Sequence, residues 1–197
     1  MPPAPPKIKR DGLILHDVGD YERYKKVQVV ANKLKHDRVF AKQANIHYLR
    51  DKFRPYSVLC HGVRNGAEVD YFSQYVPYVM GTDIAPSDHP AVIECDMHDR
   101  TSGYFDMVYS NSWDHSYDPE RMFRVWASQL YRGGHIVLEH TSLHCPSHAS
   151  ERDPFGATRK ELMDLLRKVL GSEWKVWMLN GAPDPHHDLV YIIVERA

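Results

Sequence analysis

The chain has 197 residues, of which 43% are hydrophobic, so it can fold around a core and lacks the composition of a disordered protein. With 25 Lys and Arg against 26 Asp and Glu, its formal net charge of -1 excludes a general electrostatic affinity for nucleic acid or membrane surfaces. No apolar run approaches the roughly 20 residues of a membrane-spanning helix, and MPPAPPKIKR lacks the apolar core of a signal peptide. Three widely spaced cysteines indicate reduced thiols and a cytoplasmic location.

The first 54 residues are expected to precede the core of the fold. Residues 1–19 begin with a proline-rich stretch and predict an extended lead-in. Residues 20–54 predict a helical cover that starts at Asp20 and stops before Pro55, as either one helix or two. Its apolar positions are Tyr24, Val27, Ala31, Leu34, Val39, Phe40, Ile46 and Leu49. We interpret this segment as a packing cover over the sheet, with a lid or a dimer contact as the alternatives.

The core, residues 55–197, opens with a strand, a glycine turn and a helix. Residues 56–60 form a short apolar run, as expected for a strand buried on both faces of a parallel sheet. Gly62 and Gly66 bracket a turn, and Asn65 with Glu68 three residues later predicts a helix that begins with a capping box. A helix N-terminus at the end of a strand favours a negatively charged group.

A second strand is expected to begin at residue 78 and to end at Asp83. A carboxylate at this position can accept hydrogen bonds from ribose hydroxyls. The turn and this acid together predict a site for a nucleoside cofactor. The turn does not match Gly-x-Gly-x-x-Gly, which disfavours a dinucleotide.

The rest of the core alternates between strands and helices. Strands are expected at residues 91–95, 104–109 and 135–140, and a polar loop at 141–156. Asp118 and Pro119 predict the start of a helix that Gly133 and Gly134 close. A capped amphipathic helix follows from Thr158 to Gly171, and strands at 175–179 and 189–194 form an antiparallel hairpin. The pattern predicts one α/β domain over residues 20–197, with a mostly parallel sheet and helices on both faces.

Five segments in this order resemble those of class I S-adenosylmethionine-dependent methyltransferases of the type 11 kind. They are the glycine turn at 62–66, GTDI at 81–84, ECDM at 94–97, FDMV with SNS at 105–112, and YRGGHIVL at 131–138. The match departs from the family at Cys60, where an acid is usual, and at Arg64, where the middle glycine is usual. The resemblance implies a Rossmann-like sheet of seven strands, the last inserted antiparallel between the fifth and the sixth.

The resemblance also implies S-adenosylmethionine as the cofactor. Asp83 would bind the ribose and Asp96 the adenine amino group, while the Arg64 guanidinium could pair with the cofactor carboxylate. Each of these side chains could instead be an ordinary surface or capping residue. The complete predicted set is His61, Gly62, Arg64, Gly66, Asp83, Ile84, Asp96, Met97, Ser110 and Asn111.

Methyl transfer to oxygen requires alignment of the acceptor and removal of a proton. His115, just past the fourth strand, is the predicted base, and His140 at the end of the fifth strand is the second candidate. Either histidine could instead be structural, and Trp113 and Tyr117 nearby could form an aromatic wall or ordinary packing. No metal is predicted, because the spacing of Glu139, His140, His144, Cys145 and His148 matches no zinc pattern.

The sequence therefore predicts methyl transfer to a small-molecule or glycan acceptor, at oxygen rather than at carbon or nitrogen. Ser-Asn-Ser-Trp stands in place of an Asn-Pro-Pro-Tyr tetrad, and no basic stripe is present, so no nucleic-acid partner is expected. A homodimer could complete the acceptor pocket. The alternatives are a non-catalytic protein that binds cofactor or a partner on a degenerate methyltransferase fold, and a nicotinamide-dependent reductase.

Overall fold

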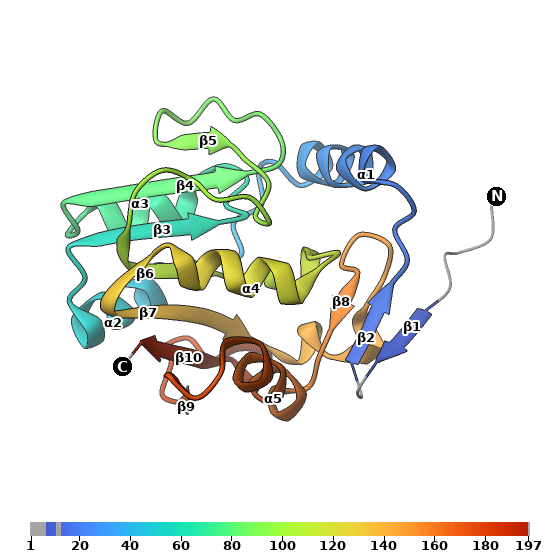
Figure 1. Ribbon diagram of the computed structural model, residues 1–197. Coiled ribbons are helices and arrows are strands. Elements are labelled where there is room, and N and C mark those ends of the chain that lie inside the picture. The colour runs from blue at the N-terminus through green and yellow to red at the C-terminus, as the bar shows by residue number, and fades with distance from the viewer. Residues whose placement is uncertain (1–6, 11–12, 197) are drawn as a thin grey trace.

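The computed structural model describes residues 7–10 and 13–196, and its centre is a seven-stranded sheet (Figure 1). The order across the sheet is β5-β4-β3-β6-β7-β10-β9. The strands are β3 (Ser57–His61), β4 (Tyr78–Asp83), β5 (Val92–Glu94), β6 (Phe105–Ser110), β7 (Leu130–His140), β9 (Trp174–Leu179) and β10 (Val190–Arg196). The first five are parallel to one another, and β10 is antiparallel to both β7 and β9. The predicted insertion of the last strand between the fifth and the sixth is confirmed.

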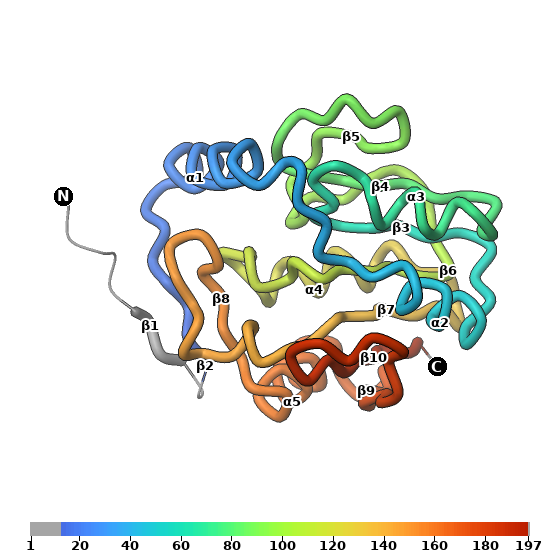
Figure 2. The backbone as a smooth tube through the Cα atoms, turned by 180° about the vertical axis from the view of Figure 1, so that it is seen from behind, coloured from blue at the N-terminus to red at the C-terminus, as the bar shows by residue number. Residues whose placement is uncertain are grey.

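Helices cover both faces of this sheet. α2 (Gln43–Phe53) and α3 (Ala67–Ser73) lie on one face, and α4 (Pro119–Ser128) and α5 (Arg159–Leu170) lie on the other (Figures 1 and 2). Successive side chains of a strand point to opposite faces, so neighbouring residues enter different cores. In β3, Val58 and Cys60 pack with α2 and α3, whereas Leu59 packs with α4 and α5.

The first helix, α1 (Tyr21–Leu34), lies over the end of the sheet rather than on either face (Figure 2). Asp20 caps it as predicted, since its side chain accepts a hydrogen bond of 2.8 Å from the backbone N–H of Arg23. Tyr24 and Ala31 are buried, but Leu34 is 67% exposed, because the helix ends where it leaves the sheet. The segment 20–54 thus contains two helices, α1 and α2, joined by an exposed connection.

A small second sheet joins two distant parts of the chain. It contains β1 (Lys7–Arg10), β2 (Leu13–His16) and β8 (Phe155–Gly156), in the order β1-β2-β8. The predicted lead-in therefore includes a hairpin, while its residues 1–6 and 11–12 lie outside the described residues. Sequence reasoning missed this sheet because β2 pairs with residues about 140 positions away, in a loop expected to be irregular. The domain boundaries drawn from sequence remain a prediction.

Two helix ends differ from the prediction. α3 begins at Ala67 with Gly66 rather than Asn65 as its cap; the Asn65 side chain donates its amide N–H to the carbonyl of His36 and accepts a hydrogen bond of 3.4 Å from the backbone N–H of Ala67. α4 ends at Ser128, well before Gly133, because Leu130 already pairs with Phe105 of β6. The box that caps α5 is confirmed. Short 3₁₀ turns are present at Trp113–His115, Ser142–His144, Pro146–His148 and His186–Asp188. In the part of the chain that the structure describes, no helix is long and apolar enough to cross a membrane.

Candidate functional site

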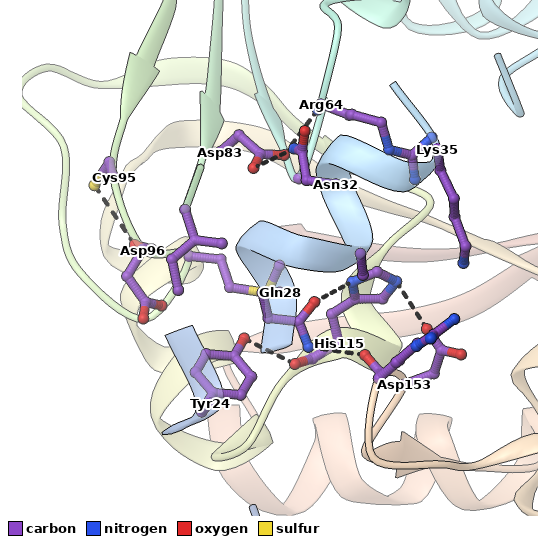
Figure 3. A pocket seen from close by; sticks show the side chains of 15 residues that line it. Tyr24, Gln28, Asn32, Lys35, Arg64, Asp83, Cys95, Asp96, His115 and Asp153 are labelled. Carbon is purple, nitrogen blue, oxygen red and sulfur yellow. Dashed lines mark hydrogen bonds and ion pairs between the residues drawn. The ribbon is translucent and has the colours of Figure 1, made fainter. Parts of the chain in front are cut away.

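Two adjoining hollows lie where the parallel strands end at their carboxyl ends. A cavity of about 40 Å³ lies under α1, next to Asp83 and Asp96 (Figure 3). A cleft of about 470 Å³ adjoins it and extends over the ends of β6 and β7. Gly62, Arg64 and His115 line both hollows, so the glycine turn lies at their junction.

Asp83 ends β4 at the wall of the small cavity, as the sequence predicts. Its Oδ2 accepts a hydrogen bond of 2.8 Å from the backbone N–H of Arg64. Its Oδ1 accepts one from the backbone N–H of Ala85 and another from the side-chain amide of Asn32, both of 2.9 Å. A carboxylate can accept about four hydrogen bonds. Three are already made here, one of them to the covering helix α1.

Asp96 lies across the same cavity, just after β5. Its Oδ1 accepts hydrogen bonds from the backbone N–H and the ring of His98, and Oδ2 has no hydrogen-bond partner among the described residues. Burial alone would raise the pKa of Asp96, but the bonds from His98 outweigh burial and lower it. Asp96 is therefore an ionised acceptor whose Oδ2 makes no well-formed hydrogen bond, although the Tyr21 hydroxyl nearby also helps to lower its pKa. Ile84 and Met97 provide apolar contact surface in the same cavity.

Both glycines of the turn are required by its geometry. Gly62 has φ +73°, and a Cβ there would lie 2.9 Å from Cβ of Ser112. Gly66 has φ +82°, and a Cβ there would lie 2.6 Å from the His89 ring. A side chain at either position would be strained and would push against a neighbour. Gly62 thus brings backbone close to both hollows without a side chain in the way, whereas Gly66, which was also predicted to contact the cofactor, lines neither hollow within the described chain.

Arg64 lies in this turn with φ 48°, and its guanidinium points along the connection between α1 and α2. It donates a hydrogen bond of 3.2 Å to the carbonyl of Arg38 and lies 5.0 Å from the centre of the Phe40 ring. Burial lowers its pKa. The guanidinium lines both hollows, so its predicted contact with a carboxylate is compatible with its place.

His61 and Ser110, two other predicted cofactor contacts, line neither hollow within the described chain. His61 is buried, bonds through Nδ1 to the Thr82 hydroxyl at 2.7 Å and stacks on Trp126. Burial lowers its pKa to about 3, so the ring is neutral. Ser110 donates a hydrogen bond of 3.0 Å to the carbonyl of His61. Both residues support the glycine turn from behind, whereas Asn111 does line the cleft.

His115 lies at the junction, held between α1 and the loop before β8 (Figure 3). Its Nδ1 is 3.0 Å from Oε1 of Gln28, and its Nε2 is 3.1 Å from Oδ1 of Asp153. Gln28 donates its amide N–H to the carbonyl of Arg152, so its oxygen faces the ring. Because both ring nitrogens face acceptors, both must carry a proton.

The charge state of His115 follows from these neighbours. Burial would lower its pKa, but the bond to Asp153 and the charge of Asp114 outweigh burial and raise it. The same contact lowers the pKa of Asp153 to about 2 against the opposing effect of burial. His115 is therefore an imidazolium in this arrangement, and it becomes a base only at a pH above its raised pKa.

His140, the second predicted base, lines neither hollow in the described part of the chain. It is buried, donates Nε2–H to the carbonyl of Ala157 at 2.9 Å and stacks on Trp113. Burial lowers its pKa to about 4. Trp113 is itself fully buried and donates its ring N–H to the carbonyl of Glu139 at 2.7 Å. Of the two roles considered for Trp113, an aromatic wall or ordinary packing, the structure shows packing. Tyr117 also packs, against the ring of Tyr24.

The structure adds site residues that the sequence did not indicate. Gln28, Asn32 and Asp153 contact predicted residues from distant parts of the chain. Glu68, expected to cap a helix, instead lines the cleft, as does Glu139. The ligand atoms of Asp114, His115 and Asp153 lie within 4.8 Å of one another, and two of the three, His115 and Asp153, form an ion pair.

Of the comparisons with known proteins, only the one with solved structures found similar proteins. No family model matches the sequence, and no curated protein does. Among solved structures, the fold is similar to a 1,6-didemethyltoxoflavin N1-methyltransferase from Burkholderia thailandensis, with a TM-score of 0.69 and 12% identity over 98% of this chain and 100% of that chain.

Two further structures are similar. One is a putative methyltransferase from Haloferax volcanii in complex with the Trm112 activator, with a TM-score of 0.65 and 13% identity over 91% of this chain and 99% of that one. The other is the sugar N-methyltransferase KedS8 from Streptoalloteichus, with a TM-score of 0.64 and 14% identity over 85% and 92%. The chain therefore has the class I fold of S-adenosylmethionine-dependent methyltransferases.

Proposed function

We propose that the protein binds S-adenosylmethionine and transfers its methyl group to a small-molecule or sugar acceptor. The observation that carries this proposal is the pair of carboxylates, Asp83 and Asp96, at the ends of neighbouring strands in one cavity. Asp83 suits a ribose diol, and Oδ2 of Asp96 suits an amino group. The similar structures from Burkholderia and Streptoalloteichus support it, since both are named as methyltransferases and the first holds S-adenosylhomocysteine.

The cofactor fits this site on one condition, which is that the helix α1 changes its position. Ligand sites of drug-sized molecules usually measure ~300–1,000 Å³. The cavity of about 40 Å³ is too small for a nucleoside while the side chain of Asn32 is hydrogen-bonded to Asp83. α1 must therefore move outward for the cofactor to bind. When bound, the cofactor would supply an electrophilic methyl group, and Gly62 and Asn111 would lie beside the part of it that reaches the cleft.

The acceptor would then lie in the cleft, next to His115. Deprotonated His115 would take a proton from an acceptor hydroxyl as the methyl group is transferred. We keep oxygen as the proposed acceptor atom, although two of the similar structures are named as N-methyltransferases. A nitrogen acceptor that reaches the site uncharged would need no base before attack, so the two cases differ in their dependence on His115. Assembly as a homodimer stays a prediction.

Calorimetric titration with S-adenosylmethionine and S-adenosylhomocysteine tests the cofactor. We expect micromolar binding, and Asp83→Ala should weaken it at least ~10-fold, which is 1.4 kcal/mol. Asp88→Ala is the matched control, because Asp88 is an exposed acid in the next loop and should bind as the wild type does. Binding of a nicotinamide dinucleotide in place of both compounds would refute the proposal.

A second candidate is a protein that binds cofactor or a partner without turnover. The contact between Asn32 and Asp83 favours it, because it closes the nucleoside side of the site. Under this alternative, cofactor would bind but no methyl transfer would be detected with a broad panel of hydroxyl and amine acceptors.

A further inference from the structure

The floor of the cleft holds two buried carboxylates whose hydrogen-bonding capacity is not used. Glu68, in the first turn of α3, is 6% exposed, and Glu139, near the end of β7, is 3% exposed. Oε1 of Glu68 accepts one hydrogen bond of 3.2 Å from the amide of Asn111. Oε2 of Glu68 and Oε1 of Glu139 have no hydrogen-bond partner among the residues that the structure describes.

Two tyrosines belong to the same cluster. The hydroxyls of Tyr109 and Tyr191 are also buried without a well-formed hydrogen bond in the described chain, although the Tyr109 hydroxyl lies close enough to Glu139 to oppose the rise in the pKa of that carboxyl. Burial and the charge of Glu139 raise the pKa of both tyrosines. Each hydroxyl can donate only one hydrogen bond and brings no charge, so the tyrosines cannot neutralise two carboxylates.

A buried carboxylate is costly unless it meets a positive charge or hydrogen-bond donors. Burial raises the pKa of Glu68 and of Glu139 to about 7, and the charge of Glu68 adds to the effect on Glu139. An anionic ligand would be repelled here, and a neutral hydroxyl would bring too few donors. A protonated amine brings a positive charge and three donors, so it is the ligand group that best matches a cleft with two unsatisfied carboxylates.

The other walls of the cleft carry four basic side chains as well as the acids Asp114 and Asp153. Lys35, Arg38, Lys42 and Arg64 line it, whereas Glu68 and Glu139 lie at its floor. A ligand that carries an ammonium and a carboxylate, as an α-amino acid does, would find a partner for each. The position of Glu68, two residues after Gly66, places this subsite beside the glycine turn.

We propose that Glu68 and Glu139 form an ammonium-binding subsite that recognises a protonated primary amine. The amine has two sources, the α-ammonium of the methionine part of the cofactor or an amine on the acceptor. The first source depends on the proposed cofactor, whereas the second can be tested without it.

The first arm of the test compares S-adenosylhomocysteine with its desamino analogue, in which hydrogen replaces the α-ammonium group. If the cofactor provides the amine, the wild type binds S-adenosylhomocysteine at least tenfold more tightly than the analogue. Glu68→Gln and Glu139→Gln each reduce this preference to less than threefold. Both substitutions keep the size of the side chain, and thermal unfolding shows whether each variant is folded.

The second arm applies if the wild type binds both compounds equally or binds neither. Primary amines of a small-molecule panel, each paired with its hydroxyl counterpart, are titrated into the protein, with S-adenosylhomocysteine present where it binds. We then expect at least one amine to bind tenfold more tightly than its counterpart, and Glu68→Gln or Glu139→Gln to remove this preference.

Asp70→Asn is the matched control for both arms, because Asp70 lies on the same helix with its side chain 67% exposed. It should keep the preference of the wild type. No amine preference in either arm, or a preference that survives both glutamine variants, overturns the proposal. Failure of S-adenosylhomocysteine to bind refutes the cofactor but leaves the second arm to decide the subsite.

Discussion

The two hollows at the end of the sheet differ in what closes them. The cavity of about 40 Å³ is closed by polar side chains of α1, chiefly Asn32, Gln28 and Tyr24. The cleft of about 470 Å³ is open, and its walls come from the glycine turn, the ends of β6 and β7, and the connection after α1. One half of the site is thus preformed, and the other depends on the position of one helix.

The contacts of α1 determine how much free energy an outward movement of this helix would cost. Its outer contacts are ion pairs from Arg23 to Glu151 and from Lys25 to Glu94, with side chains 36–47% exposed. Exposed pairs of this kind contribute only ~0–1 kcal/mol each. The sheet under the cleft is instead held by fully buried residues such as Leu59 and Val108. The inner side of α1 also carries buried contacts, since Tyr24 and Gln28 donate hydrogen bonds to the carbonyls of His115 and Arg152, and these bonds would have to break for the helix to move outward.

The largest expected effect tests the junction of the two hollows. His115→Ala should lower kcat for a hydroxyl acceptor by ~100-fold, the usual range for loss of a general base. The measurement is turnover with saturating S-adenosylmethionine, with His36→Ala, an exposed histidine outside both hollows, as the control. An unchanged kcat would mean that the acceptor needs no base from His115, as a nitrogen acceptor would.

Gly62→Ala should damage both hollows together, because Gly62 lines each of them. The new Cβ would meet Ser112 at 2.9 Å in a left-handed backbone conformation, and such crowding costs ~1–3 kcal/mol. Chemical denaturation measures the loss of stability, and calorimetry should show weaker cofactor binding. Gly171→Ala is a matched control, since it shares a positive φ but has no atom within 4 Å of its Cβ position.

Asp153→Asn should lower the pKa of His115, because the carboxylate holds the imidazolium. The pH profile of kcat should therefore shift to lower pH, since His115 loses its proton more easily. Titration of the His115 ring by NMR measures the same shift directly. Glu151→Gln, two residues away, half-exposed and paired with Arg23 rather than with His115, should leave both measurements unchanged.

The same pair makes stability depend on pH. The raised pKa of His115 adds stability that is present below about pH 6.5 and is lost as the pH rises through the folded value. The lowered pKa of Asp153 adds stability that is present above about pH 4 and is lost as the pH falls toward 2. Between these limits Asp153→Asn should cost ~1 kcal/mol, because both side chains are partly exposed. Equal stability of variant and wild type at pH 5.5 would contradict this ion pair.

The smallest effect concerns the cover itself. Asn32→Ala removes the hydrogen bond from α1 to Asp83, so S-adenosylhomocysteine should bind ~3-fold more tightly, in line with the net worth of one such bond. Hydrogen exchange of the α1 amides should also become faster. Lys33→Ala changes an exposed neighbour on the same helix and should do neither. Weaker binding in Asn32→Ala would show that Asn32 contacts the cofactor rather than competes with it.

Local patterns in the sequence determined most of the frame. Apolar runs predicted the buried strands, and Asp20, Asp118 and Thr158 predicted helix starts that the structure confirms. These signals are readable because strand burial and helix capping depend on residues only a few positions apart. The order of the strands was predicted from the family resemblance. The place of Asp83 at a strand end was predicted from the residues of the strand that precedes it.

Contacts between distant residues were decided only by the tertiary structure. The sheet of β1, β2 and β8, the pairing of His115 with Asp153, and the closure of Asp83 by Asn32 join segments from 38 to about 140 positions apart. The orientation of His61 and His140 away from the hollows was equally hidden, since a residue type does not reveal which side of a strand end it faces. Sequence by itself thus determined where strands and helices form, because their hydrogen bonds and periodicity are local. Which side chains meet at the site, and which charges they carry, depended on burial and on partners that only the folded chain brings together.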